Sequence, residues 1–230
     1  MNQLIIIGAS GHGKVIADIA KLNGYTDIAF LDDDMNKTEC NGYPVIGSVA
    51  DAQIFSDSSF IVAIGNAKLR EQIQKSLMNK GLSVVTLIHP KAVIGEKVTI
   101  GIGSVIMAGA VINSATTIGE GCIINTCASV DHDCNIANYV HVSVGSHIAG
   151  TVTIGERTWI GIGATVSNNI SITIDCMIGA GAVVVGNITT KGTYMGVPSK
   201  MKIINTSSNR GGKTLESLFN NQLNKIALSA

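Results

Sequence analysis

A six-residue repeat in the second half of the chain constrains the fold more than any other feature. From residue 94 to residue 184, isoleucine or valine stands at every sixth position, 16 times in succession without an insertion. An uninterrupted hexad of this length is typical of a hexapeptide β-helix, a parallel solenoid in which each coil stacks on the one before. Small residues stand four positions after most of these anchors, namely Ser104, Ala110, Thr116, Cys122, Ala128, Cys134, Ser146, Ala164, Cys176 and Ala182.

The repeat converts sequence spacing into geometry. With three hexads in each coil, residues 18 apart lie one above the other at about 4.8 Å, the usual spacing of paired strands. The anchors are expected to fill a triangular interior, and the small residues to fit where its walls converge. Cys122, Cys134 and Cys176 occupy this small inward position. We therefore expect these cysteines to pack in the core, with no part in redox or zinc chemistry.

Residues 1–90 follow a different pattern, in which short apolar runs alternate with segments of helical spacing. This alternation predicts a Rossmann-like α/β domain with a parallel sheet, joined to a left-handed parallel β-helix at residues 91–204. The tail, residues 205–230, is expected to be mobile or to form a short helix. The predicted strands are residues 4–7, 28–31, 60–65 and 84–89, and the predicted helices are residues 14–24 and about 67–80.

Composition excludes several classes of protein. Sixteen basic residues balance 16 acidic ones, which argues against a nucleic-acid partner because such proteins need a basic face to displace phosphate counterions. The first residues lack the basic start of a signal peptide and are too short to span a membrane. The five cysteines show no CxxC spacing. We expect a cytoplasmic protein with reduced thiols and no membrane partner.

The stretch VDHDCNIANYVHVSVGSHIAG, residues 130–150, holds three of the five histidines. His132 follows an inward anchor by two positions, so it is expected near a corner, where a side chain can leave the core. Gly150 is 18 residues later, which predicts that its N–H lies one coil away, close to the His132 ring. Asp131 and Asp133 flank His132, and a carboxylate on one ring nitrogen would orient the imidazole as a base. The spacing does not choose between the two aspartates.

His141 is nine residues, or half a coil, from His132 and is therefore expected on the far side of the prism. The two histidines cannot meet within one subunit, which argues against a metal site built from both. They can meet where several prisms pack side by side. The pattern therefore favours one catalytic base in a cleft between subunits. His147 is expected to be an ordinary exposed histidine.

The chain also resembles a known family. The segments GASGHGKVIADI, FLDDD, AIGN, LIHPKAVIG, NTCASVDHDCNIANYVHVSVGSHIAG and MGVPSK are similar to the sialic acid O-acetyltransferase and UDP-4-amino-sugar N-acetyltransferase family, the NeuD/PglD type. The resemblance covers residues 3–202. The hexads alone would indicate only an acyltransferase-type solenoid, whereas the GASGHG unit joined to them is more specific.

The resemblance implies a homotrimer that uses acetyl-CoA, with active sites between subunits and a nucleotide-sugar held by the N-terminal domain. It implies that His132 is the general base and Asp133 its partner, although many relatives have glutamate at this position. It further implies that Gly150 offers its N–H to the thioester carbonyl. The residues that it implies for binding acetyl-CoA are His141, from a neighbouring subunit, Gly150, Ile162 and Ala180.

The N-terminal glycines give G-x-x-G-x-G, which differs from the G-x-G-x-x-G of NAD-binding proteins. Glycines still let a ligand approach the backbone, and the following helix offers free N–H groups. A tight turn needed only for packing is the alternative reading. His12 lies either by the sugar or in solvent. By resemblance, the substrate-binding residues are Ala9, Ser10, Gly11, His12, Asp32, Asp33, Gly65 and Asn66.

These expectations combine into a reaction. Acetyl would pass directly from acetyl-CoA to the 4-amino group of a UDP-4-amino-4,6-dideoxy sugar of the bacillosamine type, with His132 taking the proton. The inward position of Cys134 argues against an acyl-enzyme. One alternative within the family is O-acetylation of sialic acid. An alternative of another class is a non-catalytic scaffold trimer, against which the presence of both His132 and Asp133 speaks.

Overall fold

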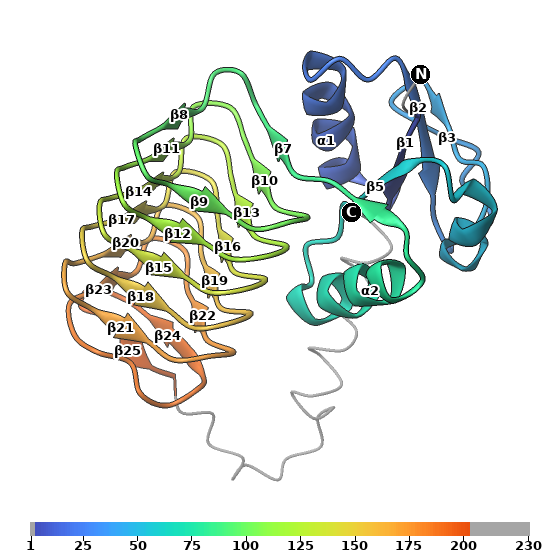
Figure 1. Ribbon diagram of the computed structural model, residues 1–230. Coiled ribbons are helices and arrows are strands. Elements are labelled where there is room, and N and C mark those ends of the chain that lie inside the picture. Colours follow the sequence, from blue (N-terminus) through green and yellow to red (C-terminus); the bar gives the residue numbers. More distant parts are fainter. Residues whose placement is uncertain (1–2, 203–230) are drawn as a thin grey trace, which may run out of the picture.

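In the computed structural model, residues 3–202 are described, and the predicted tail at 205–230 lies outside them. The chain forms an α/β unit followed by a parallel β-solenoid (Figure 1). The Rossmann-like sheet is confirmed: its four strands are parallel in the order β2-β1-β5-β6. These strands are β1 (Gln3–Ile7), β2 (Asp27–Leu31), β5 (Ser59–Val62) and β6 (Ser83–Val84).

Two helices cover opposite faces of this sheet. Helix α1 (Gly11–Leu22) packs on the face formed by Leu4 and Ile6, whereas α2 (Ala67–Asn79) packs on the face formed by Ile5 and Ile7. A strand whose successive side chains are all buried needs this covering on both sides. The smaller elements are β3 (Glu39–Cys40), β4 (Tyr43–Pro44) and the 3₁₀ helix η1 (Val49–Phe55). Among residues 3–202, no helix is both long and apolar enough to cross a bilayer.

The solenoid has three faces, each a ladder of very short strands. The first face contains β7 (Leu87–Ile88), β10 (Val105–Ile106), β13 (Ile123–Ile124), β16 (His141–Val142), β19 (Trp159–Ile160), β22 (Met177–Ile178), β24 (Thr193–Met195) and β25 (Lys200–Met201). The second contains β8 (Val93–Ile94), β11 (Val111–Ile112), β14 (Ser129–Val130), β17 (His147–Ile148), β20 (Thr165–Val166) and β23 (Val183–Val184). The third contains β9 (Thr99–Ile100), β12 (Thr117–Ile118), β15 (Asn135–Ile136), β18 (Thr153–Ile154) and β21 (Ser171–Ile172).

The register confirms the predicted 18-residue coil. Ile106 pairs with Ile124, and Ile124 pairs with Val142. Most of the anchors and many of the small residues form one continuous buried cluster, in which Cys122, Cys134 and Cys176 are buried free thiols. The cysteines therefore lie in the core, as their hexad position predicts.

The predicted strand at 84–89 is in fact two strands that belong to different sheets. Val85 donates its N–H to Phe60 in the α/β sheet, while Leu87 donates to Ser104 in the solenoid. The chain changes partners within two residues, and Ile88 already stands in the hexad register. The sequence pattern does not reveal this change of sheet, because residues 84–89 form one apolar run and both sheets bury apolar residues.

The α/β unit rests on the first face of the solenoid. Leu87, Val105, Met107 and Ile123 belong to the same apolar cluster as the α1 side of the sheet. The outer side of the first face is thus covered by α1 along its early coils. The first turn of α1, which carries His12, lies close to His141 of β16.

Candidate active site

His132 lies in the turn between β14 and β15, at a corner of the solenoid as predicted. The next residue, Asp133, has a φ of 57°, a left-handed conformation that aspartate tolerates better than most residues. This backbone brings Asp133 Oδ2 to 2.8 Å from His132 Nδ1. The local turn therefore aligns a carboxylate with the ring from the adjacent position in the chain.

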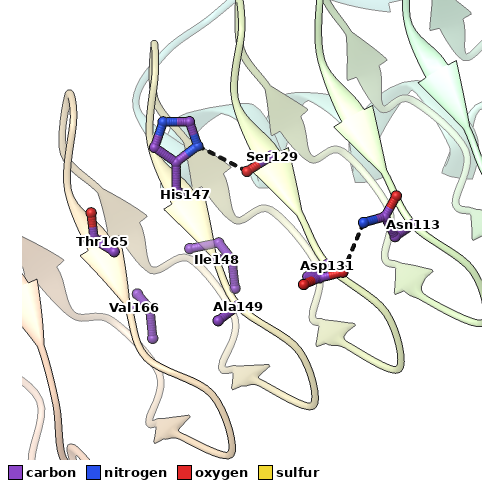
Figure 2. Close-up of a pocket in the computed structure, with 8 residues that line it drawn as sticks. All are labelled: Asn113, Ser129, Asp131, His147, Ile148, Ala149, Thr165 and Val166. Atoms are coloured by element: carbon purple, nitrogen blue, oxygen red, sulfur yellow. Dashed lines mark hydrogen bonds between the residues drawn. The ribbon is translucent and has the colours of Figure 1, made fainter.

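Asp131, the other flanking carboxylate, is bonded elsewhere. Its Oδ1 accepts hydrogen bonds from Asn113 Nδ2 at 2.7 Å and from the His132 backbone N–H at 2.8 Å. Asp131 and Asn113 line one end of a hollow of about 260 Å³ on the second face, and Figure 2 shows the hydrogen bond between them. Asp133, and not Asp131, is thus the aspartate in contact with the ring. The residues that line the hollow are Asn113, Ser129, Asp131, His147, Ile148, Ala149, Thr165 and Val166.

The two carboxylates change the proton affinity of His132. The hydrogen bond with Asp133, followed by the charge of Asp131, raises the pKa of His132 above its usual value. The side chain is more than half exposed, so burial opposes this only weakly. An exposed imidazole with a carboxylate on one nitrogen leaves the other nitrogen available to take a proton.

Gly150 lies directly under the His132 ring on the next coil. A Cβ added at Gly150 would stand 2.6 Å from His132 Nε2, closer than two such atoms can approach. Glycine is therefore required for the ring to occupy this position. Within residues 3–202, no protein group accepts a hydrogen bond from the Gly150 N–H. This donor lies beside the free ring nitrogen, as the 18-residue spacing predicts.

Two other histidines, His141 and His12, lie at the first face. His141, on β16, is buried, with its Nε2 3.1 Å from Asn125 Nδ2 and its ring 4.7 Å from that of Trp159. His12 enters from the first turn of α1, and its Nε2 is buried. His12 Nε2 and His141 Nδ1 have no hydrogen-bond partner among the described residues.

Burial makes both of these histidines weak bases. Desolvation, reinforced by the nearby Arg70 charge, lowers the pKa of His12 to about 4 and that of His141 to about 3. Both rings are therefore neutral at physiological pH. The structure brings His141 together with His12 and keeps it apart from His132, which lies at the opposite corner. His12 is half-buried and its Nε2 is enclosed, which disfavours the reading that places the ring in solvent.

The predicted N-terminal site residues follow the carboxyl ends of β1, β2 and β5, which share one edge of the sheet. Ligands of open α/β sheets bind at this edge. Asp32 is already engaged: its Oδ2 accepts from the Ala9 N–H at 2.7 Å and lies 3.2 Å from Lys37 Nζ. Asp33 accepts from the Val49 N–H at 3.0 Å. These two carboxylates hold the loops of the edge in place.

The glycines of GASGHG differ in what they do. A Cβ at Gly13 would lie 2.3 Å from the Gly8 carbonyl oxygen, so Gly13 serves close packing of α1 on the loop. At Gly11 and Gly65 a Cβ would meet nothing within 4 Å. Asn66 caps α2 by accepting from the Leu69 N–H at 3.1 Å. Close packing therefore explains why residue 13 is glycine. Packing does not explain Gly11 and Gly65, which lie on an open edge.

Ile162 and Ala180 lie one coil apart on the corner between the first and second faces, and both are exposed. Val144 stands one coil earlier on the same corner and is also exposed. Sequence reasoning missed Val144, although it precedes Ile162 by 18 residues. It also missed Asn125, the contact of His141. Within residues 3–202, no three side chains of metal-ligating type are grouped to hold an ion.

Comparisons with known proteins agree with both halves of the chain. Residues 3–77 match the family model described as PglD N-terminal domain. The chain is 35% identical over 113 residues to a UDP-N-acetylbacillosamine N-acetyltransferase of Bacillus subtilis (strain 168), covering 47% of this chain and 52% of that protein. The matches span about half the length of the curated relatives.

Two solved structures are similar over most of their length. The acetyltransferase domain of PglB from Neisseria gonorrhoeae FA1090, in complex with acetyl coenzyme A, is 40% identical, with a TM-score of 0.85. The match covers 88% of this chain and 100% of that one. PerB from Caulobacter crescentus, in complex with CoA and GDP-perosamine, is 37% identical, with a TM-score of 0.84 and coverage of 88% and 98%.

Proposed function

The chain belongs to the acetyltransferase family of the PglB acetyltransferase domain and PerB, and on this premise we propose that it acetylates the amino group of a nucleotide-linked sugar. The acceptor is the 4-amino group of a UDP-4-amino-4,6-dideoxy sugar of the bacillosamine type, and the donor is acetyl-CoA. The observation that carries the proposal is the corner where His132, Asp133 and Gly150 meet. It combines a base, its orienting carboxylate and a free N–H.

His132 is the general base of this reaction. The sugar amine attacks the thioester carbonyl, so that a C–N bond forms and the C–S bond breaks. His132 Nε2 takes the proton that the nitrogen loses, and the thiolate of CoA leaves and is then protonated. The Asp133 carboxylate orients the ring and stabilises the imidazolium, in keeping with the raised pKa of His132.

Gly150 supports the same step from the next coil. Its N–H donates to the carbonyl oxygen as negative charge develops there, and one such donor contributes about 2.7–4 kcal/mol to lowering a barrier. Cys134, two residues after His132, points into the core and is 2% exposed, which argues against an acyl-enzyme on this thiol. Transfer is therefore direct, within a complex that holds both substrates.

Acetyl-CoA lies along the corner that carries Ile162 and Ala180, with the exposed Val144 extending the same apolar column. His132 belongs to a different corner, so one copy cannot present both to a single ligand. We place the site between two subunits of a homotrimer, where His141 of one copy approaches the acetyl-CoA served by His132 of another.

The nucleotide part of the acceptor lies at the edge of the α/β sheet, beside Ala9, Ser10, Gly11, Gly65 and Asn66. The open space at Gly11 and Gly65 lets a ligand approach the backbone. Asp32 and Asp33 act by holding the loops of this edge. His12, at the start of α1, points from this edge toward His141.

The direct test mixes purified protein with acetyl-CoA and UDP-4-amino-4,6-dideoxy-N-acetylglucosamine, and follows CoA release and product mass. Gain of one acetyl group with rapid turnover supports the proposal. If the protein acetylates GDP-perosamine but not the UDP sugar, the acceptor carries guanosine diphosphate in place of uridine diphosphate, in line with the likeness to PerB. Acetylation of free sialic acid instead would show the O-acetyltransferase alternative. Failure to bind acetyl-CoA would favour the scaffold.

A further inference from the structure

Arg70, on α2, is a buried cation that has no carboxylate partner in the part of the chain that the structure describes. Its side chain is 1% exposed and is among the largest fully buried side chains of the chain. None of the ion pairs within residues 3–202 includes it. Burial lowers the pKa of Arg70 to about 10, so the guanidinium stays charged at physiological pH. A buried, unpaired charge is costly, and it persists only where its hydrogen bonds are well satisfied.

The guanidinium donates to four main-chain carbonyls, and these belong to two parts of the molecule. Nη1 donates to Ile64 at 2.8 Å and to Gly65 at 2.9 Å, in the loop that follows β5. Nε donates to Gly121 at 2.7 Å and Nη2 to Tyr139 at 2.8 Å, in turns of successive solenoid coils. A single rigid, planar group thus fixes the distance between that loop and the solenoid.

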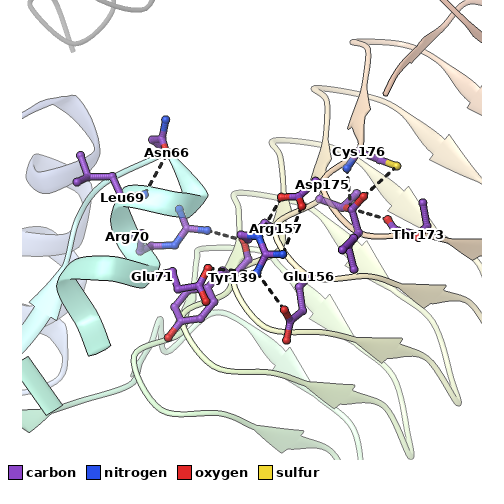
Figure 3. A network of polar contacts seen from close by, with 12 residues as sticks. Asn66, Leu69, Arg70, Glu71, Tyr139, Glu156, Arg157, Thr173, Asp175 and Cys176 are labelled. Carbon is purple, nitrogen blue, oxygen red and sulfur yellow. Dashed lines mark hydrogen bonds and ion pairs between the residues drawn. The ribbon is translucent and has the colours of Figure 1, made fainter. Parts of the chain in front are cut away.

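Ion pairs at the rim of the same interface also hold α2 against the solenoid. Arg157, on the solenoid, pairs with Glu71 of α2 at 3.2 Å and with Asp175 at 2.9 Å. Figure 3 shows this network beside Arg70, bridging α2 and the solenoid turns. Arg157 makes no contact with residues 64–65 in the hydrogen bonds of the described chain. Holding the two parts together therefore does not by itself require a buried, unpaired arginine.

The positions of the four carbonyls suggest a more specific task. Gly65 lies on the edge proposed for the nucleotide, and Tyr139 stands two residues before His141, the first residue of β16. We propose that Arg70 is a positioning residue that holds the loop after β5 in register with the solenoid. A nucleotide bound at this loop then delivers its sugar to the reacting groups. This inference rests on the proposed function. The Arg70 charge also helps keep His12 and His141 neutral.

The test compares Arg70→Lys and Arg70→Gln with Arg157→Gln as the matched control. Lysine keeps the charge but cannot span four carbonyls. We expect both Arg70 variants to raise KM for the UDP-4-amino sugar by roughly tenfold to a hundredfold, the size of effect that misplacement of a substrate produces. KM for acetyl-CoA should stay within about twofold, because Arg70 contacts none of the residues at the corner that carries Val144, Ile162 and Ala180. Arg157→Gln should leave both constants within about twofold.

Several outcomes would overturn the inference. These are an unchanged sugar KM in Arg70→Lys, an equal rise in both KM values, or an equal sugar effect in Arg157→Gln. Should the variants fail to fold, hydrogen exchange of the wild-type protein decides. The UDP-4-amino sugar should then increase protection at residues 64–70 and 139–141 together, whereas protection confined to residues 64–66 contradicts the coupling.

The same design separates this inference from the proposed function. If the wild-type protein shows no acetylation, the proposed function fails. Binding of the UDP-4-amino sugar by calorimetry then still compares wild type with Arg70→Lys. Weaker binding by the variant supports Arg70 as the positioning residue, and equal binding contradicts it.

Discussion

The solenoid places histidines in two opposite environments. At the exposed corner, His132 has a carboxylate on one nitrogen, and its pKa is raised. On the covered first face His141 is buried, and His12 reaches toward it from the first turn of α1; desolvation and the Arg70 charge lower the pKa of both rings. The same residue type thus becomes a stronger base in one place and a permanently neutral ring in the other.

The difference comes from position on the coil. Corner residues project out of the prism, where a neighbouring turn residue can reach them, whereas face residues meet whatever packs on that face. His141 alternates with the inward Val142, so it points outward and is covered by the α/β unit. The solenoid therefore presents chemically distinct histidines without any change in its own backbone.

The comparison is tested most directly by NMR titration of the histidine ring protons. His132 should titrate above 6.5, while His141, with a pKa of about 3, should stay neutral through the accessible range. This separates the two rings by more than about a thousandfold in proton affinity, at tenfold for each pH unit. Titration of His141 near 6.5 would show that its ring is not buried in solution.

Removing the exposed histidine should abolish most of the activity. In His132→Ala the amine keeps its proton, so kcat/KM should fall roughly 100-fold or more, the usual contribution of a general base. Binding of acetyl-CoA, measured by calorimetry, should remain. His89→Ala is the control, since His89 only accepts from the Lys91 N–H in the first turn. Wild-type turnover by His132→Ala would refute the mechanism.

Filling the space under the ring should have the next largest effect. In Gly150→Ala the new Cβ would lie 2.6 Å from His132 Nε2, so the ring must move. We expect kcat/KM to fall roughly tenfold to a hundredfold, as for other small misplacements of reacting groups. Gly186→Ala is the matched control, because Gly186 occupies the same corner two coils later and has nothing within 4 Å. Equal losses in both variants would exclude a specific role for Gly150.

The two aspartates should shift the pH profile by different amounts. Asp133→Asn keeps a residue that tolerates the left-handed φ, but removes the charge that raises the pKa of His132. The pKa of His132 then falls, so the acid limb of kcat/KM moves to lower pH. The plateau should drop by about tenfold or less, because a weaker and less well oriented base takes the proton. Asp131→Asn should move the limb less in the same direction, and a larger shift than in Asp133→Asn would reverse the assignment.

What the sequence predicted depends on the range of the interactions involved. The hexad register placed Gly150 next to His132 and three cysteines in the core, because each coil repeats every 18 residues. The choice of Asp133 over Asp131 depends on a turn φ and on Asn113, one coil away. That stacking of Asn113 on Asp131 could have been read from the same 18-residue spacing.

Other features depend on contacts between the two halves of the chain, which no local pattern specifies. His141 lies close to groups of the α/β unit, Arg70 on α2 and His12 on α1, and the four bonds of Arg70 join carbonyls far apart in the sequence. Nothing in the helical spacing of α2 distinguishes Arg70 from a surface arginine. For the same reason, the split of the apolar run at residues 84–89 between two sheets appears only in three dimensions.

The smallest effect is expected at Cys134, which adjoins the exposed corner in sequence yet belongs to the core. Its Sγ donates to the Ala149 carbonyl at 3.2 Å, and burial raises the pKa of this thiol, so the nucleophilic thiolate is disfavoured. Cys134→Ala should cost about 1 kcal/mol of stability through the lost hydrogen bond, and should leave kcat within about twofold. Mass spectrometry of wild-type protein mixed with acetyl-CoA alone should show no acetyl adduct. A tenfold loss of kcat in Cys134→Ala with normal acetyl-CoA binding, or an adduct on Cys134, would mean that the thiol carries the acetyl group and that corner and core are not chemically separate.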